Sequence, residues 1–311
     1  MIRRMLAIGP RKLALEGRCH PAEAPETQRA LEEVVKAFAV GYNTALAGPT
    51  GELTFPDLPR ELRGFAFEGA AMSTALVDQL TMGGGRGLRE LAAGAGERYI
   101  HLIHVGAGWA YARLRRRPWA GTEFAHPLLG WLAWDGWGFH QAFFHPQAVF
   151  VRQAVERRGR GSVQPIRDQG AGRALWFYAG ANVARIAGII GGFPAGRRRD
   201  LWAGIGLAAA YTGARQGPAV DELLTAADGY RDHLAQGAAF AAKARVLSGV
   251  MPSGCAAAVE AITGVDAETA ADWTDGALSH AIRFPDSPDA YEMWRAGIRD
   301  AWNLRAHGVA S

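Results

Sequence analysis

Three short blocks of this 311-residue chain occur twice, in the same order both times. The first copy covers residues 64–70, 105–110 and 135–140, and the second covers 175–181, 203–208 and 228–233. The last block reads Asp-Gly-aromatic-x-x-His in both copies, from Asp135 to His140 and from Asp228 to His233. Such self-similarity is typical of chains that build one core from similar units covering each other's apolar faces. We therefore expect two pseudo-symmetric repeats packed together.

The composition indicates that these repeats are helical. Glycine and alanine are abundant, β-branched residues are sparse, and alternating apolar and polar residues are hard to find, which favours helices packed through small residues. From Thr27 to Leu46 the apolar residues follow a helical period, which predicts an N-terminal amphipathic helix ending at Gly48. We expect an all-α protein, one compact unit overall. Its expected parts are an N-terminal segment and helix (1–60), helical repeat 1 (61–156), a linker (157–170), helical repeat 2 (171–250) and a C-terminal helical tail (251–311).

The charge distribution and the cysteine content indicate which kinds of partner and which cellular compartment to expect. The net charge is +4, mostly from arginine clusters, but zinc spacing and known nucleic-acid motifs are missing, so no nucleic-acid partner is expected. Solvated loops explain these clusters best, with docking of an acidic partner or an anionic membrane as the alternative. Cys19 and Cys255 form neither a disulfide framework nor a metal-type spacing, which favours the cytoplasm. The apolar run at the start is too short for a signal peptide, and no transmembrane segment is expected.

A nucleotide cofactor is not expected either. Residues 204–209 read Gly-x-Gly-x-x-Ala, which resembles a dinucleotide-binding turn, but Arg199 to Trp202 precede it where a buried strand is needed. The twin copy has Tyr111 in place of the final alanine. Close packing of helices explains both copies, so the sequence predicts no required nicotinamide or flavin.

Four residues of the first repeat are candidates for catalysis, namely Glu68, His104, Asp135 and His140. Asp135 and His140 lie about 140° apart on one helix and do not share a face. Asp135 is better interpreted as the N-cap of a helix, with His140 one turn inside as a core residue; a catalytic Asp–His block is the alternative. Glu68 lies between Phe67 and Gly69, where burial would raise its pKa into the range of a general acid.

A metal site is a further hypothesis. Glu97, His101 and His104 have helical spacing that places them on one face, and one carboxylate with two imidazoles could ligate iron or zinc. The neighbouring residues are apolar, so buried structural histidines are the alternative interpretation. Apart from this metal, no cofactor is predicted.

The aromatic residues indicate the kind of ligand. Five of the ten tryptophans fall between Trp109 and Trp137. Core packing is the ordinary explanation of such a cluster, and a flat apolar slot for an extended conjugated ligand is the functional one. The second hypothesis predicts a hydrophobic pocket walled by Trp109, Trp134, Trp137 and Phe67, with Glu68, His104 and His140 as its few polar groups.

Together, several blocks resemble a bacterial domain-of-unknown-function family encoded beside enediyne polyketide synthases. The blocks that carry the resemblance are residues 64–70, 104–110, 135–140, 168–170, 201–207 and 235–245. The resemblance implies a role in enediyne antibiotic biosynthesis, in converting a linear polyene into the enediyne core, with other proteins of that pathway as candidate partners. It implies no defined reaction. The family pattern has an acid where this chain has Ala179, which weakens any scheme that needs a carboxylate in both repeats.

Two functions remain open at this point. The first is an enzyme that acts on an apolar conjugated polyene by proton transfer or oxidation. The second is a non-catalytic polyene-binding or scaffolding protein that presents the intermediate to partner enzymes. An enclosed acid–imidazole pair would favour the enzyme, and a lone acid in the cavity would favour the binding protein.

Overall fold

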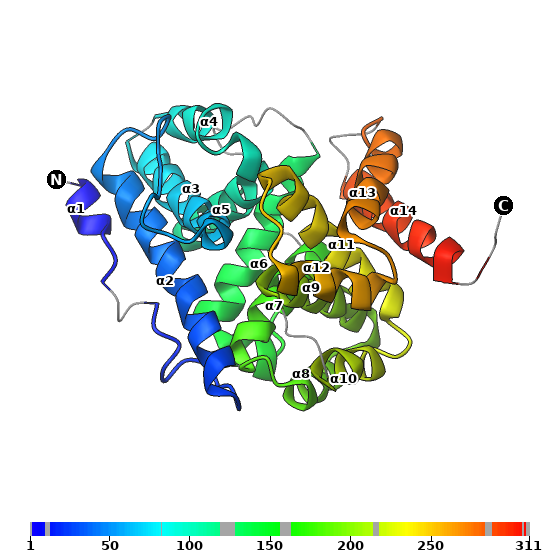
Figure 1. Cartoon of the computed structure of the whole chain (residues 1–311). Coiled ribbons are helices and arrows are strands. Elements are labelled where there is room, and N and C mark those ends of the chain that lie inside the picture. The colour runs from blue at the N-terminus through cyan, green and yellow to red at the C-terminus, as the bar shows by residue number, and fades with distance from the viewer. Residues whose placement is uncertain are drawn as a thin grey trace.

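A row of seven helices forms the body of the protein in the computed structural model, which describes residues 2–9, 13–81, 83–118, 128–155, 163–213, 218–283, 288–306 and 308. The row contains α2 (Pro25–Ala47), α3 (Arg63–Leu80), α5 (Ile100–Leu114), α6 (Leu132–Phe144), α7 (Gln164–Tyr178), α9 (Ala195–Thr212) and α11 (Arg231–Ser248). Each helix packs against the next in this order. Figure 1 shows the row running from the blue α2 to the yellow α11. All regular structure in the described part of the chain is helical, so the predicted all-α class is confirmed.

The remaining helices pack around this row. α13 (Ala267–Ala281) and α14 (Pro288–Ala306) pack on α11, and both lie at the far end of the molecule from α2 (Figure 1). The shorter helices are α1 (Ile2–Leu6), α4 (Arg86–Ala93), α8 (Val183–Gly191), α10 (Pro218–Ala226) and α12 (Ser253–Thr263). Of the helices described, none combines the length and hydropathy needed to cross a bilayer.

Four consecutive helices of the row each carry two glycines separated by one residue. These pairs are Gly106 and Gly108 in α5, Gly136 and Gly138 in α6, Gly170 and Gly172 in α7, and Gly204 and Gly206 in α9. Residues i and i+2 of a helix point roughly 200° apart, so each pair presents one glycine to each neighbouring helix. A Cβ at Gly170 would lie 1.9 Å from the carbonyl oxygen of Asp135 on α6, and one at Gly172 would lie 2.1 Å from that of Leu201 on α9. In every pair the first glycine meets the preceding helix and the second meets the following one.

The Gly-x-Gly pairs therefore place each helix between two close neighbours. This is the packing role expected for residues 204–209, whose glycines lie against the carbonyl oxygens of Gln169 and Leu234.

Because an added methyl group has no room, we expect Gly170→Ala to lower the free energy of unfolding by about 2–3 kcal/mol. The matched control is Gly276→Ala in α13, where a Cβ would meet nothing within 4 Å and should stabilise the helix by up to about 1 kcal/mol. Urea unfolding measures both; equal effects of the two substitutions would contradict this account of the packing.

The expected pseudo-symmetry of two repeats is not confirmed. Asp135 is buried inside α6, whereas Asp228 is exposed in the turn before α11. His140 lies in the third turn of its helix and His233 in the first. The two Asp-Gly-aromatic-x-x-His blocks thus occupy different local structures, and the unit that recurs is a single helix with its Gly-x-Gly pair.

The expected linker also differs from the structure. α7 begins at Gln164, so the second part of the segment 157–170 is helical and belongs to the centre of the row. Residues 157–162 lie outside the described residues. Glycine and arginine suggested a loop here, but Gly170 is required by the close approach of α6.

Candidate functional site

Three buried charged side chains meet at the centre of the row. Arg173 on α7 donates from Nη1 to Oδ1 of Asp135 on α6 at 2.6 Å, and its Nη2 lies 3.5 Å from Oε1 of Glu68 on α3. Glu68, Asp135 and Arg173 are 3%, 1% and 8% exposed. We call this group the Glu68–Arg173–Asp135 triad. Charged residues are seldom buried this deeply unless they are paired, and here one cation serves two carboxylates.

Neutral side chains also donate hydrogen bonds to the two carboxyl groups of the triad, and each carboxyl group has a different donor. The Gln169 amide donates to Oδ2 of Asp135 at 2.9 Å and to the Tyr291 hydroxyl at 3.2 Å. Glu68 accepts at Oε1 from the indole Nε1 of Trp109 at 3.1 Å. Asp135 therefore has the short ion pair and an amide donor, whereas Glu68 has the longer contact with Arg173.

This difference makes Glu68 the carboxyl group whose surroundings favour the protonated form more strongly. Burial raises the pKa of Glu68 above its ordinary value, and the charge of Asp135 raises it further, while Arg173 and Trp109 oppose the shift. With both carboxylates ionised, the triad would carry one uncompensated negative charge in an apolar core, which is costly. A proton on Glu68 leaves the Arg173–Asp135 pair neutral as a whole.

An aromatic cavity of about 40 Å³ lies against Glu68 and Arg173. Its aromatic walls are Phe38, Phe65, Trp109, Phe139, Phe143 and Phe177. The Trp109 ring lies 4.7 Å from the rings of both Phe38 and Phe139, and the Arg173 guanidinium lies over Phe139 at 5.0 Å. This aromatic cavity thus offers ring faces on its walls and a carboxyl group with a raised pKa at its base.

Of the predicted pocket residues, Glu68 and Trp109 meet in this aromatic cavity. Trp134 and Trp137 are buried and their rings lie 5.5 Å apart, but neither lines the aromatic cavity. Phe67, one residue before Glu68, points away from it and stacks on Tyr99 at 4.4 Å. Adjacent residues of a helix point about 100° apart, and here Glu68 lines the aromatic cavity while Phe67 packs on Tyr99.

The structure corrects two expectations about bonding partners. Asp135 does not cap a helix, because it lies within the first turn of α6 and its carboxylate binds Arg173 and Gln169. The partner of Glu68 is a guanidinium and an indole, where an imidazole was expected. His140 packs with its ring 5.9 Å from Trp109 and lines a different space.

The candidate metal ligands do not converge. Glu97 lies in a short 3-10 turn before α5, and the Nδ1 of His104 donates to the carbonyl oxygen of Ile100 at 2.7 Å within the helix. His101 lines a second cavity of about 50 Å³ together with Asp135 and Arg173. Within the described ranges, no three Cys, His, Asp or Glu side chains come together as a metal site would require.

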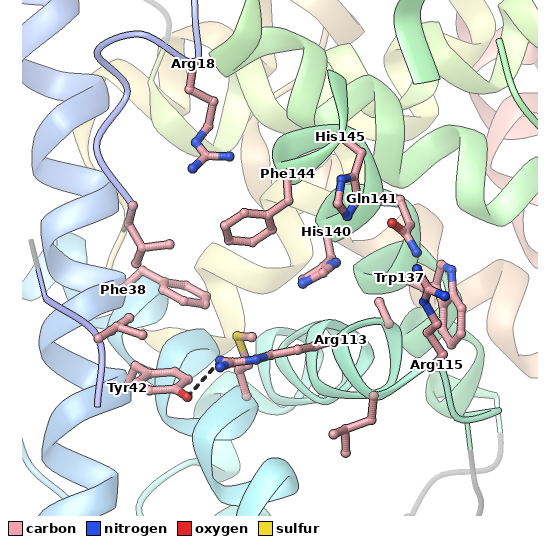
Figure 2. A pocket seen from close by; sticks show the side chains of 15 residues that line it. Arg18, Phe38, Tyr42, Arg113, Arg115, Trp137, His140, Gln141, Phe144 and His145 are labelled. Carbon is pink, nitrogen blue, oxygen red and sulfur yellow. Dashed lines mark hydrogen bonds between the residues drawn. The ribbon is translucent and has the colours of Figure 1, made fainter. Parts of the chain in front are cut away.

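An open pocket of about 1180 Å³ lies between α2, α5 and α6. Figure 2 shows Phe38 and Tyr42 of α2 on one side and Trp137, His140 and Phe144 of α6 on the other. Leu13 and Phe38 line both this open pocket and the aromatic cavity. The two spaces are therefore neighbours.

Two buried histidines predict acid sensitivity. Burial lowers the pKa of His140 to about 3, with smaller contributions from His145 and Arg113, and burial near Arg299 lowers that of His233 to about 2. Both groups bind a proton in the unfolded chain at a higher pH than in the folded one. Each should therefore lower the stability by about 1.4 kcal/mol per pH unit as the pH falls below about 6.5.

Replacing His140 with glutamine should remove one such contribution. We expect the plot of unfolding free energy against pH, measured with urea between pH 6.5 and 4.5, to be shallower for His140→Gln than for the wild type. His280→Gln, on the exposed face of α13, is the control and should keep the wild-type slope. Parallel curves for all three proteins would contradict the neutral, buried state of His140.

Sequence reasoning missed Arg173, the residue that joins the two carboxylates. Its signal was present, because Arg173 lies between Gly172 and Ala174 in a Gly-x-Gly helix that packs on both faces. A cation in such a position needs a buried anion. Gln169 lies in one of the blocks that carry the family resemblance, residues 168–170, but nothing in the sequence indicated that it or Tyr291 would contact Asp135 or its partners.

Comparison with known families accounts for nearly the whole chain. The family model described as "Protein of unknown function (DUF1702)" matches residues 1–302. The chain belongs to this family. Neither the curated proteins nor the solved structures contain a significant match. The DUF1702 match includes every member of the triad and both walls of the open pocket, so these features lie within the part that defines the family.

Proposed function

We propose that this protein is an enzyme of enediyne biosynthesis that acts on an apolar conjugated polyene, with Glu68 as the proton donor and acceptor. The observation that carries the proposal is the placement of Glu68. Its carboxyl group is buried, has a raised pKa and faces the aromatic cavity. A conjugated hydrocarbon offers no hydrogen-bonding groups, so its site needs apolar walls and one group that can transfer a proton.

The chemistry follows from these groups. Protonated Glu68 transfers its proton to one carbon of the conjugated chain, the electron pair of a C=C bond forms the new C–H bond, and the positive charge spreads along the remaining double bonds. The ring faces of Trp109 and Phe139 stabilise that charge. Loss of a proton from another carbon to the Glu68 carboxylate then restores the double bonds. The product is an isomerised polyene with its double bonds moved, with no net change in oxidation state.

Arg173 and Asp135 act as positioning residues in this scheme. The Arg173–Asp135 pair is short and supported by Gln169, so it holds the guanidinium in place while Glu68 changes charge. When Glu68 loses its proton, Arg173 lies close enough to stabilise the carboxylate. Trp109 fixes the orientation of the carboxyl group by donating to Oε1.

The sizes of the two spaces set how the ligand is accommodated. A cavity of about 40 Å³ exceeds the roughly 10–15 Å³ that one water needs, but is too small for a long polyene. Only the end of such a chain fits against Glu68. The rest extends past Phe38 into the open pocket, which at about 1180 Å³ exceeds the usual range of small-molecule sites.

A non-catalytic polyene-binding or scaffolding protein is the second candidate. The observation that favours it is that both carboxylates of the triad are paired, as they are in a purely structural ion network. In that case the aromatic cavity and open pocket hold the polyene, and Glu68 only contributes to folding.

Gene deletion with complementation distinguishes the two candidates. In a host that makes the polyene, deletion of the gene should cause a linear intermediate to accumulate. The wild-type gene should restore the later product, and the Glu68→Gln gene should not, although its protein is present at the same level. Full restoration by Glu68→Gln would support the binding protein and reject the enzyme.

A further inference from the structure

We infer that the open pocket between α2, α5 and α6 binds an oxyanion, a carboxylate or a phosphate, at one end of an amphipathic ligand. The apolar chain of that ligand then leads toward the aromatic cavity. The assignment of the chain as a polyene rests on the proposed function, whereas the anionic end follows from the lining of the pocket alone.

The lining is strongly basic. Arg18 from the N-terminal segment, Arg113 from α5 and Arg115 at the end of α5 all line the pocket, and none of its described lining residues is Asp or Glu. Figure 2 shows Arg18 and Arg113 reaching into the space from opposite sides. Guanidinium groups that line one pocket can donate charge-assisted hydrogen bonds to the same bound anion.

Arg113 is the arginine most available to a ligand. Its guanidinium donates to the Tyr42 hydroxyl at 3.3 Å, as the dashed line in Figure 2 marks. Within the described part of the chain it forms no ion pair. Arg18 holds its guanidinium over the Phe144 ring at 4.9 Å. Both cations thus lie against aromatic side chains, an arrangement suited to a ligand with a charged end and an apolar chain.

The backbone at Arg115 provides a second observation. Arg115 ends α5 in the left-handed region, with φ +52°. Three other helices, α9, α11 and α12, end in the same region with Gly213, Gly249 and Gly264. Glycine adopts this conformation without steric cost and arginine does not. The side chain of Arg115 therefore occupies a position where helix termination alone would favour glycine.

His140 provides a third observation. It is 7% exposed and lines the pocket, and its Nδ1 has no hydrogen-bond partner within the described residues. Burial lowers its pKa to about 3, so the ring is neutral near pH 7. A neutral imidazole beside the arginines adds no negative charge to the lining, so it does not compete with an anionic ligand for their guanidinium groups.

Titration with parinaric acid, a fluorescent conjugated tetraene fatty acid, tests the inference directly. We expect the acid to bind at least roughly tenfold more tightly than its uncharged methyl ester, because the ester cannot accept charge-assisted hydrogen bonds as strongly. Added salt should weaken binding of the acid more than binding of the ester.

Substitutions of the arginines that line the pocket test which of them bind the anionic end of the ligand. Arg113→Gln should weaken binding of the acid roughly tenfold and leave binding of the ester unchanged. Arg115→Gly should also weaken binding of the acid without lowering the melting temperature, since glycine suits the left-handed backbone. Arg86→Gln is the matched control, because Arg86 is an exposed arginine of α4 that pairs only with Glu90 among the described residues.

Competition with the bound parinaric acid distinguishes a free carboxylate from the phosphate of a carrier-bound chain as the anionic end of the ligand. Octanoate displaces it if the pocket takes a free carboxylate, and phosphopantetheine displaces it if the pocket takes the phosphate of a carrier-bound chain. Equal binding of acid and ester, no binding of either, or unchanged acid binding by Arg113→Gln would each overturn the inference. Glu68→Gln should bind the acid normally, so a failure of the proton-transfer proposal would leave this result unaffected.

Discussion

We expect the Arg173→Met variant to lose about 3–5 kcal/mol of unfolding free energy at pH 7. Methionine fills much of the volume of arginine but leaves Glu68 and Asp135 as two buried carboxylates without a cation. Asp135 loses its 2.6 Å ion pair, and Glu68 keeps Trp109 as its one remaining side-chain donor among the described residues. Urea unfolding followed by circular dichroism measures the loss.

The same variant should regain stability when the pH is lowered. Without Arg173, two buried carboxyl groups lose their cation and protonation removes a buried charge, so acid favours the folded variant more than it favours the folded wild type. Its stability relative to the wild type therefore rises as the pH falls from 7 toward about 4.5. A triple variant that adds Glu68→Gln and Asp135→Asn should recover most of the loss at pH 7. A loss below about 1 kcal/mol, or one independent of pH, would show that the triad is not the buried charge centre described here.

The second large effect is on activity. Glu68→Gln should reduce polyene conversion about a hundredfold to ten-thousandfold, the usual contribution of a general acid–base group. Glutamine has the shape of glutamic acid and its oxygen can still accept from Trp109, so the melting temperature should stay within a few degrees of the wild type. Glu68→Asp keeps the acid but shortens its reach, and we expect it to retain part of the activity. If conversion falls only in proportion to stability across these variants, Glu68 has a structural role.

The sequence predicted the helices and the buried acid because both leave local signals. The apolar period from Thr27 to Leu46 matches α2, and the aromatic and glycine residues around Glu68 correctly indicated burial. The glycines at 204 and 206 were correctly assigned to helix packing. In each case the neighbours of a residue in the chain determine its environment.

The partners of Glu68 could not be predicted in this way. Trp109 and Arg173 lie 41 and 105 residues further along the chain, and their approach depends on how α3, α5 and α7 pack. The repeated Asp-Gly-aromatic-x-x-His block was misleading for the same reason. The same residue pattern lies inside α6 in one copy, and in the other it spans the turn before α11 and the first residues of that helix.

The position of the triad also changes what an alanine at position 179 implies for the proposed chemistry. A scheme with one carboxylate in each repeat would need an acid at this position, which is fully buried at the end of α7. In the structure both carboxylates come from the first half of the chain, on α3 and α6, and the second half contributes the cation. The absence of an acid at position 179 therefore does not weaken the proton-transfer scheme.

Deuterium incorporation is the measurement that tests the central claim most directly. The polyene that accumulates in the deletion host is incubated with purified protein in D₂O, recovered and analysed by mass spectrometry and NMR. If Glu68 transfers protons, the wild type should place deuterium on a carbon of the polyene, and Glu68→Gln should not, although it binds parinaric acid as tightly as the wild type. Labelling by Glu68→Gln at the wild-type rate would contradict the account.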